Sequence, residues 1–108
     1  MSNDKPLNNL GNEIIEINRC NGWNVAKPQD WSDDYKIPAL LALVTSEVSE
    51  ALEAFRKRDA RNFDEELADV LIRTLDLSTG LGIDMDLEVQ KKLAKNRGRS
   101  PKHGGKRI

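Results

Sequence analysis

The sequence is poor in the residues that crosslink or chemically specialise small proteins. Cys20 is the only cysteine among 108 residues, so an intrachain disulfide is impossible and a cysteine-rich zinc site is excluded. Aromatic residues make up 5 % of the chain and charged residues 32 %, which suits amphipathic helices better than an all-β sandwich. No apolar run approaches the roughly 18 residues that span a bilayer, and Met1 to Leu10 lack the basic-then-apolar order of a signal peptide. We therefore expect a soluble, cytoplasmic protein.

Acidic residues are missing from the end of the chain. The net charge is only -1, yet a cluster of cations and no acid follows Glu88: Lys91, Lys92, Lys95, Arg97, Arg99, Lys102, Lys106 and Arg107. Such a cluster can contact nucleic acid, anionic lipid or the phosphates of a small ligand, and composition alone does not choose among them. The only histidine, His103, lies in this Gly-rich tail, where a solvated side chain is expected more than a catalytic one.

Apolar residues recur at three- and four-residue steps in four segments, each of which predicts a helix. The segments cover about residues 7–21, 37–57, 62–81 and 84–96. The third opens at Asn62, where Glu65 completes a capping box, and the fourth at Asp84 or Asp86. Residues 22–36 lack the period and form a loop. Short links imply antiparallel neighbours, so we expect an all-α fold: one domain over residues 1–108, a compact four-helix bundle with a basic tail from about 98 to 108.

The same periods predict which side of each helix is buried. The expected buried residues are Leu7, Leu10, Ile14 and Ile17 of the first helix, Ile37, Leu40, Leu41, Val44, Val48, Ala51, Leu52 and Phe55 of the second, and Phe63, Leu67, Val70, Leu71, Thr74, Leu75 and Leu81 of the third. Gly11 is expected to weaken the first helix locally. One copy of so short a chain has little core, so another subunit is expected to cover a second face of these helices.

Four carboxylates form a candidate site. Glu47 and Glu50 lie three residues apart on the second helix, and Glu66 and Asp69 lie three apart on the third, so each pair projects from one helical face. If the two helices pack antiparallel, the pairs face each other across a groove at the edge of the core. The four acids would then repel one another and raise their own pKa values unless a cation lay between them.

Magnesium is the cation that this donor set favours. Oxygen-only ligands suit magnesium, manganese or calcium, and no histidine lies in these helices to support zinc or a di-iron site. Magnesium shares its shell with phosphates, which predicts a phosphate ester or anhydride as substrate. A plainer interpretation stays open, because acids on solvated helix faces are common and Asp69 with Arg73 can form an ordinary (i, i+4) ion pair.

The acids also form part of a longer pattern. Glu47-Val-Ser-Glu50, then fifteen residues, then Glu66-Leu-Ala-Asp69 resembles the ExxE…ExxD signature of the MazG-like all-α NTP pyrophosphatases, close to their dCTP pyrophosphatase branch. Residues 40–44 and 67–72 resemble the two central helices of that family. Residues 92–99 resemble its K-x-x-x-N-x-x-R segment, so that the resemblance covers roughly residues 31–108.

The resemblance implies a magnesium-dependent hydrolase, with manganese as a substitute, that converts a nucleoside triphosphate to the monophosphate and pyrophosphate in nucleotide-pool house-cleaning. The residues carried over are Glu47, Glu50, Glu66 and Asp69 as metal ligands, one of them also the base, Lys92, Asn96 and Arg99 as triphosphate contacts, and Trp31 as the stacking partner of the nucleobase. Relatives form dimers or tetramers, so a homodimer or homotetramer is expected. Neither a membrane nor nucleic acid is the expected partner.

Some features leave alternatives open. Many relatives carry an extra acid beside the first pair, where this chain has Ser46 and Ala51, so the number of metal ions or the base can differ. On the same scaffold, phosphoribosyl-ATP pyrophosphohydrolase is a second enzymatic interpretation. A third interpretation is a non-catalytic helical module whose basic tail binds RNA or DNA in a salt-sensitive way.

Overall fold

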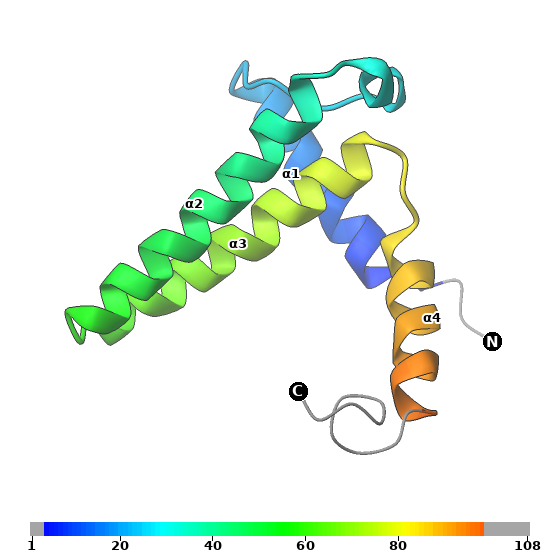
Figure 1. Ribbon diagram of the computed structural model, residues 1–108. Helices are drawn as coiled ribbons and strands as arrows, with labels where there is room; N and C mark the ends of the chain where they lie inside the picture. Colours follow the sequence, from blue (N-terminus) through cyan, green and yellow to red (C-terminus); the bar gives the residue numbers. More distant parts are fainter. Residues whose placement is uncertain (1–3, 99–108) are drawn as a thin grey trace.

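Four α-helices make up most of the computed structural model, which describes residues 4–98 (Figure 1). They are α1 (Pro6–Cys20), α2 (Lys36–Arg56), α3 (Ala60–Gly80) and α4 (Met85–Arg97), and a short 3₁₀ helix, η1 (Pro28–Ser32), lies in the loop between α1 and α2. The prediction of an all-α chain with four helices is confirmed. None of the described helices is long and apolar enough to cross a membrane.

The helices α2 and α3 form an antiparallel hairpin (Figure 1). At the turn, the Asp59 amide donates to the Ala54 carbonyl at 2.9 Å while Arg58 takes a left-handed backbone with φ 57°, which ends α2 in a Schellman-type cap. The Asp59 side chain then accepts a hydrogen bond from the Asn62 amide at 3.1 Å. The capping box predicted at Asn62 is therefore wrong, because Asp59 satisfies that amide and starts the helix earlier, at Ala60.

The helix α1 packs against α3 through a glycine. Gly11 is buried, and a Cβ on it would collide with the side chain of Thr79, so the missing side chain lets the two helices approach closely. Ile14 is buried as predicted, whereas Leu10 and Ile17 of the same predicted stripe are exposed. The buried face of α1 differs from the predicted stripe because it is the face that carries Gly11, Ile14 and Ile15.

An exchange of helix caps attaches α4 to α1. The Asp86 carboxylate of α4 accepts hydrogen bonds from the amides of Leu7 and Asn8 at 3.0 and 2.8 Å, and thereby caps α1. In return, Asn8 Oδ1 accepts a hydrogen bond from the Met85 amide at 3.0 Å. Each helix thus satisfies free amides at the start of the other, which fixes the angle between them at this one junction.

Asp84 strengthens the same junction. It is the N-cap of α4, accepts a hydrogen bond from the Leu87 amide at 3.1 Å, and binds Lys5 Nζ at 2.7 Å. The hydrogen bond from Lys5, followed by those from Asn8 and the Leu87 amide, lowers the pKa of Asp84 to about 2. A lowered carboxyl pKa favours folding above the unfolded pKa, so this contribution is lost as the pH falls toward 2. Beyond the junction, residues 90–98 of α4 are all exposed.

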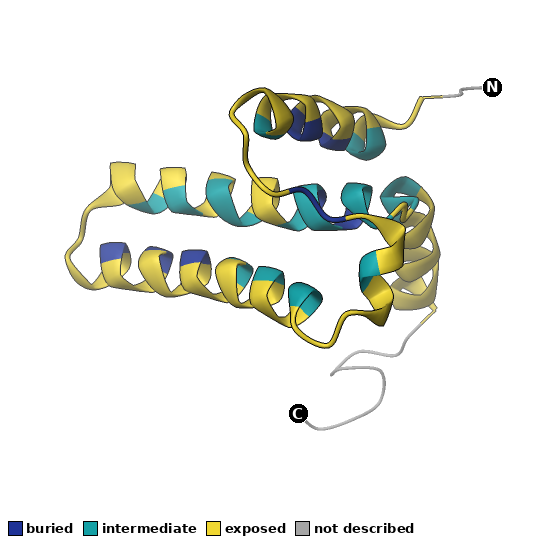
Figure 2. Ribbon diagram, turned by 90° about the horizontal axis from the view of Figure 1, so that it is seen from above, coloured by how far each residue is buried: buried dark blue, intermediate teal, exposed yellow. Residues whose placement is uncertain are grey.

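The buried core of the single chain is small. Figure 2 shows buried positions on the facing sides of the helices and in the loop after α1, while the outer sides are exposed. The buried apolar residues are Ile14, Ile15, Val25, Ala26, Ala51, Ala54 and Leu75. The Cα radius of gyration is 16.3 Å, against about 13 Å for a compact domain of this length. The four helices are thus arranged more openly than in the compact bundle expected from the sequence.

Apart from Leu75 of α3, the large apolar side chains of the hairpin lie outside this core. α2 turns Ala51 and Ala54 toward α3, because small side chains let the two helices pack closely, and the predicted stripe of larger residues is left at the surface. Phe55 contacts Phe63 of α3 with ring centroids 6.4 Å apart, so the stripes of the two helices adjoin. The exposed residues, together called the apolar face, are Leu41, Val48, Leu52 and Phe55 of α2 and Leu67 and Leu71 of α3, each about half exposed.

Gly80, the last residue of α3, offers a test of the packing between α3 and the loop before η1. A Cβ on Gly80 would lie 2.6 Å from the carbonyl oxygen of Ala26, a backbone atom that cannot rotate away. We expect Gly80→Ala to lower the free energy of unfolding by about 1–3 kcal/mol, as measured by urea or thermal unfolding. Gly98→Ala is the matched control, because its new Cβ would meet no atom closer than 3.7 Å. Equal stability of the two variants would contradict the close approach at Gly80.

Candidate active site

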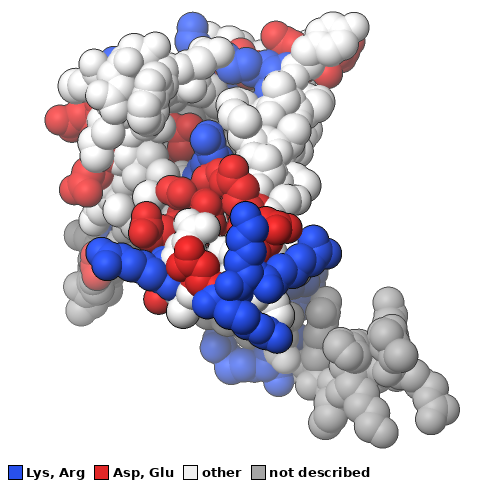
Figure 3. All heavy atoms as spheres, turned by 90° about the vertical axis from the view of Figure 1, so that its left-hand side faces the viewer, with Lys and Arg blue, Asp and Glu red and all other residues white. Residues whose placement is uncertain are grey.

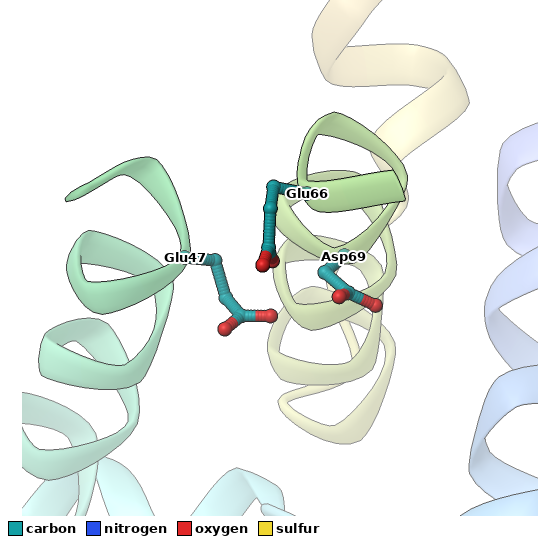
Figure 4. Close-up of side chains that lie close together, drawn as sticks. All are labelled: Glu47, Glu66 and Asp69. Carbon is teal, nitrogen blue, oxygen red and sulfur yellow. The ribbon is translucent and has the colours of Figure 1, made fainter. Parts of the chain in front are cut away.

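The two acid pairs meet where α2 and α3 lie side by side. Glu47 of α2 points toward Glu66 and Asp69 of α3 (Figure 4), and one carboxylate oxygen from each of the three lies within 4.8 Å of the others. The three-residue spacing puts each pair on one helical face, and the short turn between the helices brings the pairs to the same depth. The sequence predicted this convergence of acids on two antiparallel helices, and the structure contains it.

Glu50 joins the group from its exposed side. Its carboxyl hydrogen-bonds to Glu47 and to Glu66, although it lies outside the tightest set of three acids. All four acids that the sequence singled out are therefore neighbours. Three of them present oxygens close enough together to surround one ion.

Little compensates the negative charges of these acids. Burial, followed by the charges of Glu50 and Glu47, raises the pKa of Glu66 to about 7. Burial, followed by a hydrogen bond that the protonated Glu47 donates to Glu50, also raises the pKa of Glu47. In addition, Glu66 Oε1 is buried and has no hydrogen-bond partner within residues 4–98. A hard divalent cation takes oxygen ligands and would relieve both the repulsion and the unpaired oxygen, so the residues present fit a metal of this kind.

The raised pKa of Glu66 predicts a stability that depends on both pH and metal. Without metal, the folded protein holds the Glu66 proton up to about pH 7, whereas the unfolded chain releases it near its ordinary, lower pKa. The contribution of Glu66 to the free energy of unfolding is therefore greatest below the pKa of the unfolded chain and is lost as the pH rises through 7. We expect the melting temperature in EDTA to fall between pH 5 and 8, and magnesium to restore it at pH 8.

Two variants separate this effect from general titration. Glu66→Gln removes the titrating carboxyl and should flatten the pH dependence, while Glu65→Gln changes an exposed neighbour and should leave it as in the parent protein. A melting temperature in EDTA that rises from pH 5 to 8 would contradict the assignment.

Arg73 enters the acid group from α3. Its Nε lies 3.6 Å from Glu47 Oε2, so the ion pair joins the two helices, in place of the (i, i+4) pair with Asp69 that the sequence offered as the plainer interpretation. One guanidinium cannot neutralise four carboxylates. It is, however, a cation with planar, paired donors beside the acids, which suits an anionic ligand such as phosphate.

An open cleft runs from the acids along α2 and α3 to the end of α1. Its volume is about 630 Å³, which falls in the range of small-molecule sites, about 300–1,000 Å³. Glu47, Asp69 and Arg73 line it at the acid group. Its other lining residues are Asn18 of α1, Trp23 and Asn24 of the following loop, Lys36, Ala39, Leu40 and Leu43 of α2, and Ile72 and Asp76 of α3.

The structure favours a different tryptophan from the one that the resemblance selected. Trp23 lines the cleft and is 63 % exposed, so a flat ligand could stack on its open face. Trp31, the predicted stacking partner, lies on η1, is 78 % exposed and is not among the residues that line the cleft of this chain. The role of Trp31 stays a prediction. Trp23 lies in the loop without a helical period, and the sequence alone favours core or loop packing for it over contact with the base.

The predicted phosphate contacts are not gathered at the acids. Lys92 and Asn96 lie on the exposed part of α4, which contacts α1 and α3 and points away from the hairpin (Figure 1). Arg99 and His103 lie outside the described residues. A different basic cluster surrounds the α2–α3 turn: Arg56, Lys57, Arg58 and Arg61, all exposed. Figure 3 views this side of the molecule, where basic side chains stand beside a group of acidic ones.

Comparison with known protein families identifies the family to which the chain belongs. Residues 36–104 match the family model described as the MazG nucleotide pyrophosphohydrolase domain, and this match covers more than half of the sequence. The chain therefore belongs to the MazG family of nucleotide pyrophosphohydrolase domains, as the sequence pattern indicated. The matched range begins with α2 and contains both acid pairs. No curated protein and no solved structure gives a significant match.

Proposed function

We propose that the protein is a magnesium-dependent nucleoside triphosphate pyrophosphohydrolase, which converts a ribo- or deoxyribonucleoside triphosphate to the monophosphate and pyrophosphate. The observation that carries this proposal is the convergence of Glu47, Glu66 and Asp69 beside a cleft of nucleotide size. A cation among the acids would hold the phosphates there and leave the rest of the cleft to the nucleoside. Membership of the MazG family supports the class of reaction.

Each part of the acid group has a role in the proposed reaction. Glu47, Glu50, Glu66 and Asp69 would hold magnesium, with manganese as a substitute. The bound ion would polarise the phosphate oxygens and make the attacking water more acidic. Water adds across the phosphoanhydride: its oxygen forms a bond to phosphorus, the bond to the departing phosphate group breaks, and one of the four carboxylates takes the proton of the water.

Basic side chains are proposed to hold the rest of the triphosphate. Arg73 lies 3.6 Å from Glu47, and Lys36 lines the cleft with its Nζ 3.2 Å from Asn24 Oδ1. Both can donate charge-assisted hydrogen bonds, which strengthen as negative charge gathers on the departing pyrophosphate. We keep a phosphate role for Lys92, Asn96 and Arg99. Because α4 points away from the acids of its own chain, Lys92 and Asn96 would meet phosphate in the site of a neighbouring subunit.

A homodimer or homotetramer is part of the proposal. The apolar face presents large, half-exposed side chains on two adjoining helices, and a continuous apolar surface of this kind is typical of an interface. The buried core of one chain is small, so a second copy would supply the missing burial. The whole of residues 1–108 is proposed to act as one domain, in the cytoplasm, in nucleotide-pool house-cleaning.

The experiment that tests the function is a panel of ribo- and deoxyribonucleoside triphosphates with detection of pyrophosphate. We expect pyrophosphate and the matching monophosphate to form with magnesium, a slower or similar reaction with manganese, and none in EDTA. Release of orthophosphate instead of pyrophosphate would contradict the reaction type. Activity in EDTA equal to that in magnesium would contradict the metal.

The same panel separates the alternative functions. If the protein is a phosphoribosyl-ATP pyrophosphohydrolase of histidine biosynthesis, phosphoribosyl-ATP added as a competitor should be hydrolysed in preference to the nucleoside triphosphates. A nucleic-acid module would bind RNA or DNA in a salt-sensitive way, would keep that binding after loss of the acid pairs, and would release no pyrophosphate from any triphosphate.

A further inference from the structure

Asp76 of α3 is a half-buried acid that the proposed reaction does not use. It lines the same cleft as Asp69 and Trp23. Its Oδ1 atom is buried and has no hydrogen-bond partner among the described residues, while Asn18 of α1 hydrogen-bonds to its carboxyl group. The carboxylate is thus held by α1 through one hydrogen bond and has one oxygen left over in a ligand-sized cleft.

The unpaired Oδ1 atom of Asp76 is a hydrogen-bond acceptor without a donor among residues 4–98. Buried polar groups in proteins nearly always have a hydrogen-bond partner, because an unmade bond costs free energy. Burial raises the pKa of Asp76, and the hydrogen bond from Asn18 and the charge of Arg73 oppose that rise. An ionised carboxylate only accepts hydrogen bonds. A ligand that enters the cleft with an N–H or O–H group can therefore supply the missing partner.

The position of Asp76 along α3 indicates which part of a nucleotide it meets. Asp69 and Asp76 are seven residues apart on one helix, and this separation corresponds to about 10.5 Å along the helix axis. A nucleotide whose phosphates lie at the acid group would span this length with its sugar and base. The far edge of the nucleobase, and not the sugar next to the phosphates, would then lie at Asp76, with Trp23 lining the same part of the cleft.

We propose that Asp76 is a specificity-determining residue that accepts a hydrogen bond from the exocyclic amino group of a cytosine or adenine base. The proposal rests on the proposed function and names its substrate class. An amino base offers an N–H to Oδ1, whereas the oxo counterpart, uracil or hypoxanthine, turns a carbonyl oxygen toward the carboxylate and is repelled. Asn18 is the positioning residue, because its amide holds the other end of the carboxyl group.

Two pairs of substrates that differ at this one group test the proposal: the cytosine and uracil triphosphates, and the adenine and hypoxanthine triphosphates. We expect the parent protein to favour the amino member of each pair by about 10- to 100-fold in kcat/KM, the range for a hydrogen bond to a charged group. Asp76→Asn, whose amide can also donate, should lower that ratio at least about 10-fold and retain turnover of the oxo substrates. Asp64→Asn, an exposed acid of the same helix, should leave the ratio unchanged.

Three results would overturn the role of Asp76. They are a parent protein that favours the oxo bases, an Asp76→Asn ratio equal to that of the parent, and an equal loss on all four substrates, which indicates a structural role. Calorimetric binding of cytidine and uridine monophosphates to the same two proteins keeps this test separate from catalysis. If no triphosphate releases pyrophosphate, the proposed function fails, while a preference for cytidine monophosphate that Asp76→Asn removes would still support the role of Asp76.

Discussion

Asp69→Asn is expected to reduce magnesium-dependent pyrophosphate release by at least about 100-fold. Loss of a residue that only supports a metal ligand lowers activity by up to about 100-fold, and loss of a direct ligand should lower it by at least as much. The change keeps the shape of the side chain and removes the charge of one of the three acids whose oxygens lie within 4.8 Å of one another. The reaction is measured by initial rates over a range of magnesium concentrations. Part of the lost rate should return at high magnesium, because a weakened site fills again by mass action.

Stability measurements show whether this loss comes from the site or from misfolding. Without metal, Asp69→Asn removes one of several repelling charges, so its melting temperature in EDTA should equal or exceed that of the parent. Magnesium should raise the melting temperature of the parent but much less that of the variant. Asp64→Asn, exposed on the same helix, should behave as the parent in both assays. Full activity of Asp69→Asn would remove Asp69 from the metal site.

Leu71→Glu is expected to convert the proposed oligomer to a single chain. Leu71 belongs to the apolar face and is 49 % exposed in the isolated chain, so the substitution spares the core but would bury a charge in the proposed interface. The loss at such a central position is about 2 kcal/mol or more, which weakens association about 30-fold or more. Molecular mass from light scattering or sedimentation, followed over a dilution series, measures the change.

The control for this variant adds the same charge elsewhere. Gln90→Glu lies on the exposed part of α4 and should keep the mass of the parent. The far-ultraviolet circular dichroism of Leu71→Glu should remain helical, and its pyrophosphate release should fall with its mass if subunits share the site. A parent protein that is a single chain at all concentrations would refute the oligomer outright.

The helices and the acid group could be predicted because both depend on local spacing. Four apolar periods located α1 to α4, and three-residue spacing placed Glu47 with Glu50 and Glu66 with Asp69 on common faces. The short α2–α3 turn then fixed the depth at which the pairs meet. These are properties of neighbours in the chain, so one sequence was enough to predict the arrangement, while the bound metal stays a prediction.

Burial could not be predicted in the same way. A period identifies an apolar stripe but not which of its members another helix covers: of the predicted stripe of α2, Ala51 is buried, while Val48 and Leu52 are about half exposed. Gly11 looked like a weak point and proved to be a contact point, because its meaning depends on Thr79, 68 residues away. Contacts between distant segments depend on tertiary packing, which local sequence patterns do not reveal.

The cleft was the least predictable part of the site. Trp23 and Asn24 lie in a loop without a period, and Asn18 appeared to be one polar residue among many on α1. Asp76 had no motif around it, and its proposed role depends on a buried oxygen that has no partner in the described part of the chain. Such residues are found only once α1, the loop and α3 have been brought together.

Because α4 is attached to the other described helices at one end only, a small rotation at the junction would produce a large displacement at its other end. α4 is gripped at its first residues and follows Gly82, which has a left-handed backbone with φ 82°. From Asp84 to Asn96 the helix extends about 18 Å, so a rotation of about 10° at the junction would sweep Asn96 through about 3 Å, the length of a hydrogen bond. Small changes around Asp84 and Asp86 are thereby amplified at the far end of α4. The position of the Lys92–Asn96 segment therefore depends on contacts made at the other end of the helix.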